Sequence, residues 1–184
     1  MHAGQAAVGA WLFQHRGWLP VPLFALCLVA TPQLRPGALL LVFCGEGVRL
    51  AAVGHIGRRS RTRDHSVGAL VDSGPYSRLR NPLYVGNVLI WSGVSLVGWP
   101  WGAVAVPALA LHYAIIVRWE EGNLLAKLGA PYADYLRRVP RWLPLGTPVE
   151  GRYDLRGALR SERGTFAVLA LIAAAFAFRW YLGT

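Results

Sequence analysis

Hydrophobic positions along the chain form long apolar runs separated by short polar stretches. A helix needs about 20 mostly apolar residues to cross roughly 30 Å of bilayer hydrocarbon. The first run, 17–34, lies between Arg16 and Arg35 and is close to the shortest length that spans. Few cations precede it and 31–33 is a poor cleavage site, so we expect a membrane span rather than a cleaved signal peptide.

Three further runs follow. The stretch 36–56 is interrupted only by two charged residues, and 81–117 contains no Asp, Glu, Lys or Arg, with a Gly-Trp-Pro-Trp-Gly turn at 98–102 in its middle. The last run begins at 164, and the Gly-, Pro- and Arg-rich stretch 145–164 is expected to link a cytoplasmic helix to it. The pattern predicts five transmembrane helices, at about 18–34, 36–56, 83–98, 101–119 and 165–182.

Composition supports an all-α integral membrane protein. Apolar residues make up 54% of the 184 residues and charged residues only 15%, against about 25% in soluble domains. We expect one domain over 1–184, with about five transmembrane helices and a helical cap on the cytoplasmic side.

The basic residues are distributed unevenly, and their distribution predicts orientation. The net charge is +10, and 15 of the 19 Lys and Arg residues fall in two segments, 57–82 and 118–164. In a five-span arrangement both segments lie on one side, which the positive-inside rule assigns to the cytoplasm. The N-terminus is then cytoplasmic and the C-terminus outside. Topology accounts for the charge, so the expected partner is the lipid bilayer and not nucleic acid.

The two cysteines, Cys27 and Cys44, both lie within apolar runs and have no neighbouring His cluster. We expect two buried thiols and neither a disulfide framework nor a metal site.

Glu46 and Arg49 are charged residues inside a predicted span, where charge is costly. Their spacing of three places them on one helix face. They could form a self-neutralising buried pair, or they could line a substrate cavity.

The segment 74–87 joins a basic stretch to the third span. Gly74 and Pro75 predict a turn, Asn81 an N-cap, and Pro82 the first turn of a helix. Such a helix start could be only structural, or its free N–H groups could bind an anion.

Glu120 and Glu121 are adjacent at the end of the fourth predicted span, where they repel each other and oppose the helix dipole. They could be a solvated helix end paired with Arg, or they could bind a cation. The stretch after them is predicted to form short helices lying on the membrane surface. The signals are leucines at helical spacing, a C-cap at Gly129, and Tyr132 with Tyr135 on one helix face.

Taken in order, these features resemble the isoprenylcysteine carboxyl methyltransferase superfamily of membrane methyltransferases, which includes relatives of phosphatidylethanolamine N-methyltransferase. The matching pieces are Gly74-Pro75-Tyr76, Arg80-Asn81-Pro82-Leu83-Tyr84-Val85-Gly86, Glu120-Glu121 with Leu124, Gly129 with Tyr132 and Tyr135, and Val139-Pro140-Arg141 with Pro144. Asn81 stands where the family usually has His.

The resemblance implies a cofactor-binding core at about 74–144 that takes S-adenosylmethionine. It implies cofactor contacts from Arg80, Asn81, Pro82, Tyr84, Gly86, Glu120, Glu121, Tyr132 and Tyr135.

Arg141 and Glu46 are the residues that we expect to act on the acceptor. The resemblance implies methyl transfer to a lipid-like or small hydrophobic acceptor, through a carboxylate or a thiol. One alternative is a phospholipid amine, which would need a base such as Glu46, His55 or His112. Another is a non-catalytic membrane protein that binds lipid or a partner. The sequence selects neither the acceptor nor an oligomeric state.

Overall fold

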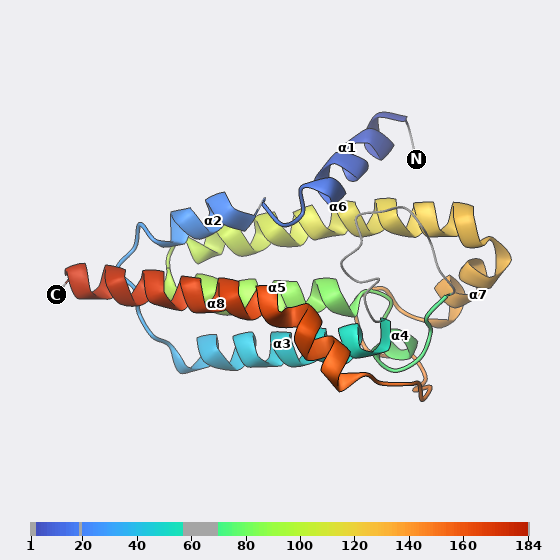
Figure 1. Cartoon of the computed structure of the whole chain (residues 1–184). Helices are drawn as coiled ribbons and strands as arrows, with labels where there is room; N and C mark the ends of the chain where they lie inside the picture. The colour runs from blue at the N-terminus through green and yellow to red at the C-terminus, as the bar shows by residue number, and fades with distance from the viewer. Residues whose placement is uncertain (1–2, 19, 57–69, 184) are drawn as a thin grey trace.

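The computed structural model describes residues 3–18, 20–56 and 70–183, and every regular element in these ranges is an α-helix. The main bundle consists of α3 (Pro36–Ile56), α5 (Pro82–Val97), α6 (Gly102–Leu128) and α8 (Leu155–Gly183), which share one long axis (Figure 1). Two helices, α1 (Ala3–Gln14) and α2 (Pro20–Cys27), pack on α6, and two short ones, α4 (Pro75–Arg78) and α7 (Ala130–Arg138), lie at one end of the bundle.

Within the described ranges, three helices, α3, α6 and α8, are long and apolar enough to cross a bilayer. The fourth member of the bundle, α5, is apolar but has 16 residues, which rise about 24 Å at 1.5 Å per residue. Large apolar side chains such as Phe43 and Leu171 face outward, as lipid-facing positions do. The chain is an integral membrane protein, and α3 has the bounds that were predicted for the second span.

The closest helix pair is α3 with α5, and glycines allow it. A Cβ added to Gly45 would lie 2.6 Å from the carbonyl oxygen of Gly86, and one added to Gly86 would lie 2.5 Å from Cγ of Arg49. Backbones without side chains at these points approach closely, as in other membrane helix pairs. The contact brings the aliphatic stem of Arg49 against α5.

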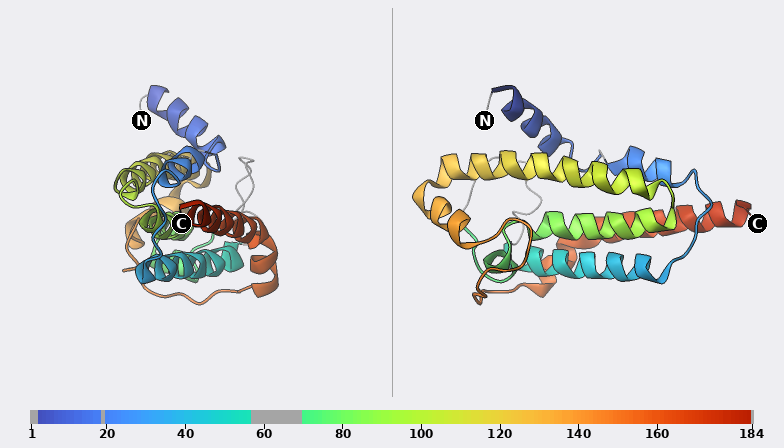
Figure 2. Two further views of the ribbon diagram at one scale, coloured as in Figure 1. Left: turned by 90° about the vertical axis from the view of Figure 1, so that its left-hand side faces the viewer. Right: turned by 180° about the vertical axis from the view of Figure 1, so that it is seen from behind.

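The first predicted span, 18–34, is not a single helix. Among the described residues of this range only Pro20–Cys27 is helical, and 31–35 belongs to no regular element. Pro20 and Pro22 lack an N–H and are best tolerated in the first turn of a helix, and Pro32 disfavours helix beyond the turn at 28–30. Before this break, α1 leaves the bundle at an angle (Figure 2).

Two other predicted boundaries were wrong. The helix predicted for the fourth span does not end at 119, since α6 continues to Leu128 and is closed by Gly129, whose φ of 61° is left-handed. The glutamates are therefore inside a helix and not at its end. The last helix begins at Leu155 and not at 165, because an Asp154 carboxylate oxygen accepts the N–H of Gly157 at 2.9 Å as an N-cap.

Cysteine burial was predicted correctly for only one residue. Cys27 is buried between α2 and the end of α5, but Cys44 is exposed. Cys44 follows the outward-facing Phe43 on α3, and a thiol on this face meets lipid rather than the core.

Candidate functional site

Several helix ends and one long loop meet at one end of the bundle. The α3 C-terminus, α4, the α5 N-terminus, α7 and the loop 139–154 are all there, together with the last turns of α6 (Figure 1). Antiparallel packing of α3 with α5 and of α5 with α6 brings them to the same place. Segments that the sequence separates by 40 to 60 positions therefore come into direct contact.

Glu121 is buried at the centre of this end, and its carboxylate oxygens accept hydrogen bonds from neighbouring side chains. Nη2 of Arg141 donates to Oε2 at 2.7 Å, and Nδ2 of Asn81 donates to Oε1 at 3.1 Å. Nε of Arg80 lies 3.4 Å from Oε1. The hydrogen bond to Glu121 raises the pKa of Arg141, which keeps the guanidinium charged. The bend at 80–81 and the loop at 141 are thus both held on one carboxylate of α6.

Asn81 has a different role from the predicted cap. It occupies the N-cap position of α5, but its side chain makes no capping hydrogen bond. The amide reaches Glu121 and also donates to the carbonyl oxygen of Arg141 at 3.3 Å. A buried carboxylate is the stronger acceptor, so the amide ties the helix start to α6.

Glu120 has one engaged and one open oxygen. The Tyr84 hydroxyl donates to Oε2 at 2.8 Å, and no other hydrogen bond to this carboxylate exists within the described residues. The Tyr84 ring stacks obliquely on Tyr113 with centroids 5.4 Å apart. The bond to Tyr84 therefore fixes the position of the Glu120 carboxylate, and Oε1 can still accept a hydrogen bond from a ligand.

Tyr132 and Tyr135 form the aromatic cover of α7 and are both buried. They pack with Val139 against Leu124 and Leu128 of α6, so a short helix is present where one was predicted. Burial raises the pKa of both hydroxyls, so they stay neutral. The Tyr135 hydroxyl donates to the carbonyl oxygen of Tyr76 at 2.8 Å.

Arg49 belongs to a second buried polar cluster. Its Nη2 donates to both carboxylate oxygens of Glu162 on α8, at 2.9 and 2.7 Å, and its Nη1 donates to the amide oxygen of Asn87 on α5. Glu46, the partner expected from spacing, is farther away, with Oε2 at 3.7 Å from Nε. The predicted self-neutralising pair is thus secondary to an ion pair between α3 and α8. Neither Glu46 nor Arg49 contacts the Glu121 cluster through a hydrogen bond that the structure describes.

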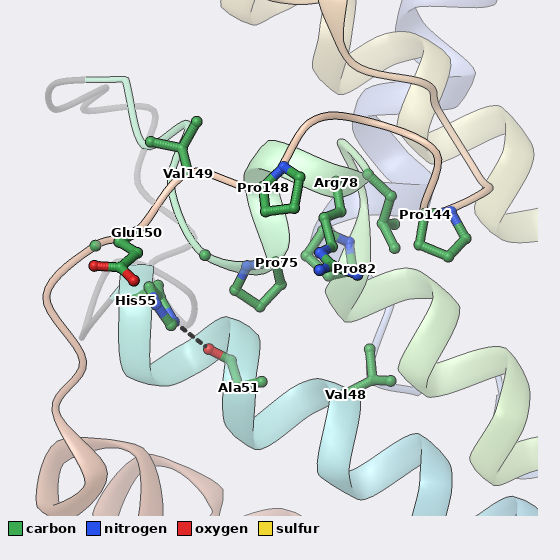
Figure 3. A pocket seen from close by; sticks show the side chains of 13 residues that line it. Val48, Ala51, His55, Pro75, Arg78, Pro82, Pro144, Pro148, Val149 and Glu150 are labelled. Atoms are coloured by element: carbon green, nitrogen blue, oxygen red, sulfur yellow. Dashed lines mark hydrogen bonds between the residues drawn. The ribbon is translucent and has the colours of Figure 1, made fainter.

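A cavity of about 540 Å³ lies beside these clusters, between the last turns of α3 and the loop 144–151 (Figure 3). Val48, Ala51 and four prolines make its walls mostly apolar, and the polar lining groups are His55, Arg78 and Glu150. This volume is within the range of small-molecule sites, roughly 300–1,000 Å³. Pro82 and Leu79 line it, while their neighbours Arg80 and Asn81 reach Glu121, so the cavity and the Glu121 cluster lie on either side of one short segment.

Of the predicted cofactor residues, Arg80, Asn81, Tyr84, Glu120 and Glu121 come together, with Arg141. Gly86 packs against α3 instead. The sequence interpretation missed Asn87, Glu162, Thr165 and the buried hydroxyl of Tyr76. Two signals could have found two of them: Asn87 is a polar residue inside the charge-free run 81–117, and Glu162 is a carboxylate just before the last apolar run.

Comparison with curated proteins gives two relatives in bacteria. The chain is 38% identical over 108 residues to the cobalt-zinc-cadmium resistance protein CzcN of Cupriavidus metallidurans, covering 58% of this chain and 50% of that protein. It is 33% identical over 109 residues to the nickel-cobalt-cadmium resistance protein NccN of Alcaligenes xylosoxydans xylosoxydans, covering 58% and 51%. The chain spans about half the length of these relatives. No solved structure matches it.

A sequence model of the phospholipid methyltransferase family matches residues 35–129. This range includes α3, α5 and α6, and with them Arg80, Asn81, Tyr84, Glu120 and Glu121. It ends before the α7 tyrosines and Arg141. Because the match covers more than half of the chain and agrees with the resemblance of the motifs, the chain belongs to the phospholipid methyltransferase family.

Proposed function

We propose that this protein transfers a methyl group from S-adenosylmethionine to a lipid-like or small hydrophobic acceptor at the membrane boundary. The observation that supports this most is the direct contact of the Arg80–Asn81 bend with Glu121, the second of the two adjacent glutamates of α6. Family membership supports the same reaction class.

The residues present fit such a cofactor. Bound S-adenosylmethionine supplies an electrophilic methyl group on a sulfonium, together with an ammonium, a carboxylate and ribose hydroxyls. The open oxygen of Glu120 is suited to an ammonium or a ribose hydroxyl, and Arg80 to a carboxylate. Tyr84 would hold Glu120 in place, and Tyr132 and Tyr135 would cover the site from the side of α7.

The protein's contribution to the reaction is position and exclusion of water. Holding donor and acceptor in line can lower a barrier by about 7–11 kcal/mol at best. A site enclosed by buried tyrosines also favours a reaction in which an anionic nucleophile neutralises a sulfonium, because water stabilises the separated charges more than the product.

The acceptor, in this proposal, uses the neighbouring cavity for its apolar part. The proline walls of the cavity are rigid. Arg78 has no ion-pair partner among the described residues, so its guanidinium can bind an acidic group of the acceptor. Arg141 is committed to Glu121, which makes it a positioning residue rather than a group for the acceptor. A phospholipid amine is the second candidate, favoured by the family match.

Cofactor binding by the purified protein in lipid nanodiscs tests the proposal. Wild-type protein should bind S-adenosylhomocysteine by calorimetry, and Glu120→Gln should weaken binding about tenfold or more, since the hydrogen bonds lost are to a charged group. Glu150→Gln, at an exposed cavity residue, is the matched control and should bind normally. Absence of binding by the wild-type protein would refute the proposed function.

The acceptor class follows from a separate measurement. Incubation with cofactor labelled on the methyl group and total membrane lipid should give a labelled product. Loss of a negative charge indicates a carboxylate acceptor, and label in a phospholipid headgroup indicates an amine.

A further inference from the structure

The Tyr76 hydroxyl is a buried polar atom with no hydrogen-bond partner within the described part of the chain. The side chain is only 7% exposed, and its oxygen is shielded from solvent. A buried donor without a partner is destabilising, and native proteins rarely leave one without a reason. A ligand atom is one such reason.

The backbone of Tyr76 is held on several sides, so the ring position is set by tertiary structure. Its carbonyl oxygen accepts the Tyr135 hydroxyl at 2.8 Å. The N–H of Gly74 donates to the carbonyl oxygen of Val149 at 2.7 Å, and the Ser77 hydroxyl donates to the carbonyl oxygen of Gly74 at 2.7 Å. The anchored backbone therefore fixes where the Tyr76 hydroxyl lies, and the side chain cannot easily move to reach another hydrogen-bond partner.

The charges around this hydroxyl have opposite signs. Burial raises its pKa most, the charge of Glu120 raises it further, and the charge of Arg49 lowers it. The phenol is thus neutral, able to donate and accept, and lies within electrostatic reach of a carboxylate and a guanidinium. Nε of Arg80 and Nε of Arg49 are also buried without a hydrogen bond, although each is near a glutamate.

We propose that Tyr76 binds the amino-acid end of the methyl donor. This rests on the proposed function. An amino-acid group carries an ammonium and a carboxylate on one carbon, so it needs an anion, a cation and a neutral hydrogen-bonding group at close quarters. Glu120, Arg80 and the Tyr76 hydroxyl are groups of these three kinds, and they come from α6, the α5 start and α4, which meet at one end of the bundle. The adenosine end has no such charges.

Two ligands that differ only at this end test the proposal. S-adenosylhomocysteine has the amino-acid end, whereas 5′-methylthioadenosine keeps the adenosine and the thioether but lacks it. Calorimetry on the full-length protein in nanodiscs should show Tyr76→Phe binding S-adenosylhomocysteine about ten- to a hundredfold more weakly, the loss expected for one hydrogen bond to a charged group. Binding of 5′-methylthioadenosine should be unchanged. Tyr153→Phe, at an exposed tyrosine, is the control and should bind both normally.

Thermal unfolding without ligand excludes a merely structural role. Because the hydroxyl makes no hydrogen bond within the described residues, Tyr76→Phe should unfold at the wild-type temperature or higher. Equal weakening of both ligands, or normal binding of both, would overturn the assignment of Tyr76 while leaving the proposed function intact. A wild-type protein that binds neither ligand would overturn both.

Discussion

Glu120 and Glu121 are neighbours in sequence with the same chemistry, yet their surroundings give them different tasks. Glu121 is surrounded by Arg80, Asn81 and Arg141, so both oxygens are used within the protein. Glu120 has only the Tyr84 hydroxyl. A helix rotates about 100° per residue, and this rotation alone directs one carboxylate to the bend and leaves the other open.

Replacing Glu121 with Gln should therefore affect stability before ligand binding. Two guanidiniums would lose their counter-charge, and breaking a buried pair typically costs about 3–5 kcal/mol. The loss should be at the low end, because the Arg141 side chain is 35% exposed and can be solvated. We expect a lower midpoint of thermal unfolding for Glu121→Gln and little change for Glu120→Gln. Similar midpoints for the two variants would contradict this division.

At the level of elements, the contact of α3 with α5 carries the site. It sets the distance between Arg49 and Asn87 and holds the start of α5 near α6. The contact depends on glycines that allow backbone approach, and it is supported from α8 by the ion pair of Glu162 with Arg49.

Gly45 and Gly47 lie two positions apart, on opposite faces of α3, and make a matched test of this contact. A Cβ at Gly45 would meet the Gly86 carbonyl oxygen at 2.6 Å, whereas nothing lies within 4 Å of one at Gly47. Gly45→Leu should force the helices apart and lower the unfolding temperature, and Gly47→Leu should be neutral or stabilising because leucine favours helix over glycine. Equal effects of the two substitutions would show that the close approach is not needed.

For the whole molecule, the basic segments come to one end of the bundle. The described parts of 57–82 and 118–164 gather around α4, α7 and the α8 start, while the C-terminus lies at the opposite end (Figure 1). We propose that the end bearing α7 faces the cytoplasm, because Lys and Arg are retained there during insertion. The site would then meet soluble cofactor from the cell interior.

Reporter fusions check this orientation. An enzyme reporter that folds only outside the cytoplasm should be active when fused at the C-terminus and inactive when inserted in the loop 145–153. The opposite pattern would place the site on the outer face and would exclude supply of cofactor from the cytoplasm.

The sequence by itself determined those features that depend on neighbouring residues. Hydropathy over about 20 positions identified α3, the glycine after Leu128 identified a helix end, and the ordered motifs identified the family. Local signals also misled: the proline-rich first run has enough apolar residues for a span but breaks after Cys27, and Asn81 has the chemistry of a cap without capping.

Tertiary structure alone decided which polar groups meet. Arg49 has a carboxylate three residues away, yet it binds Glu162, 113 positions later, because packing of α8 on α3 brings that carboxylate closer than Glu46. Likewise only the fold shows that Glu121 is saturated, that Glu120 is open and that the Tyr76 hydroxyl lacks a partner within the described chain. Partner choice in a buried, low-dielectric interior depends on distances of a few tenths of a nanometre between helices, and no local pattern of residues encodes such distances.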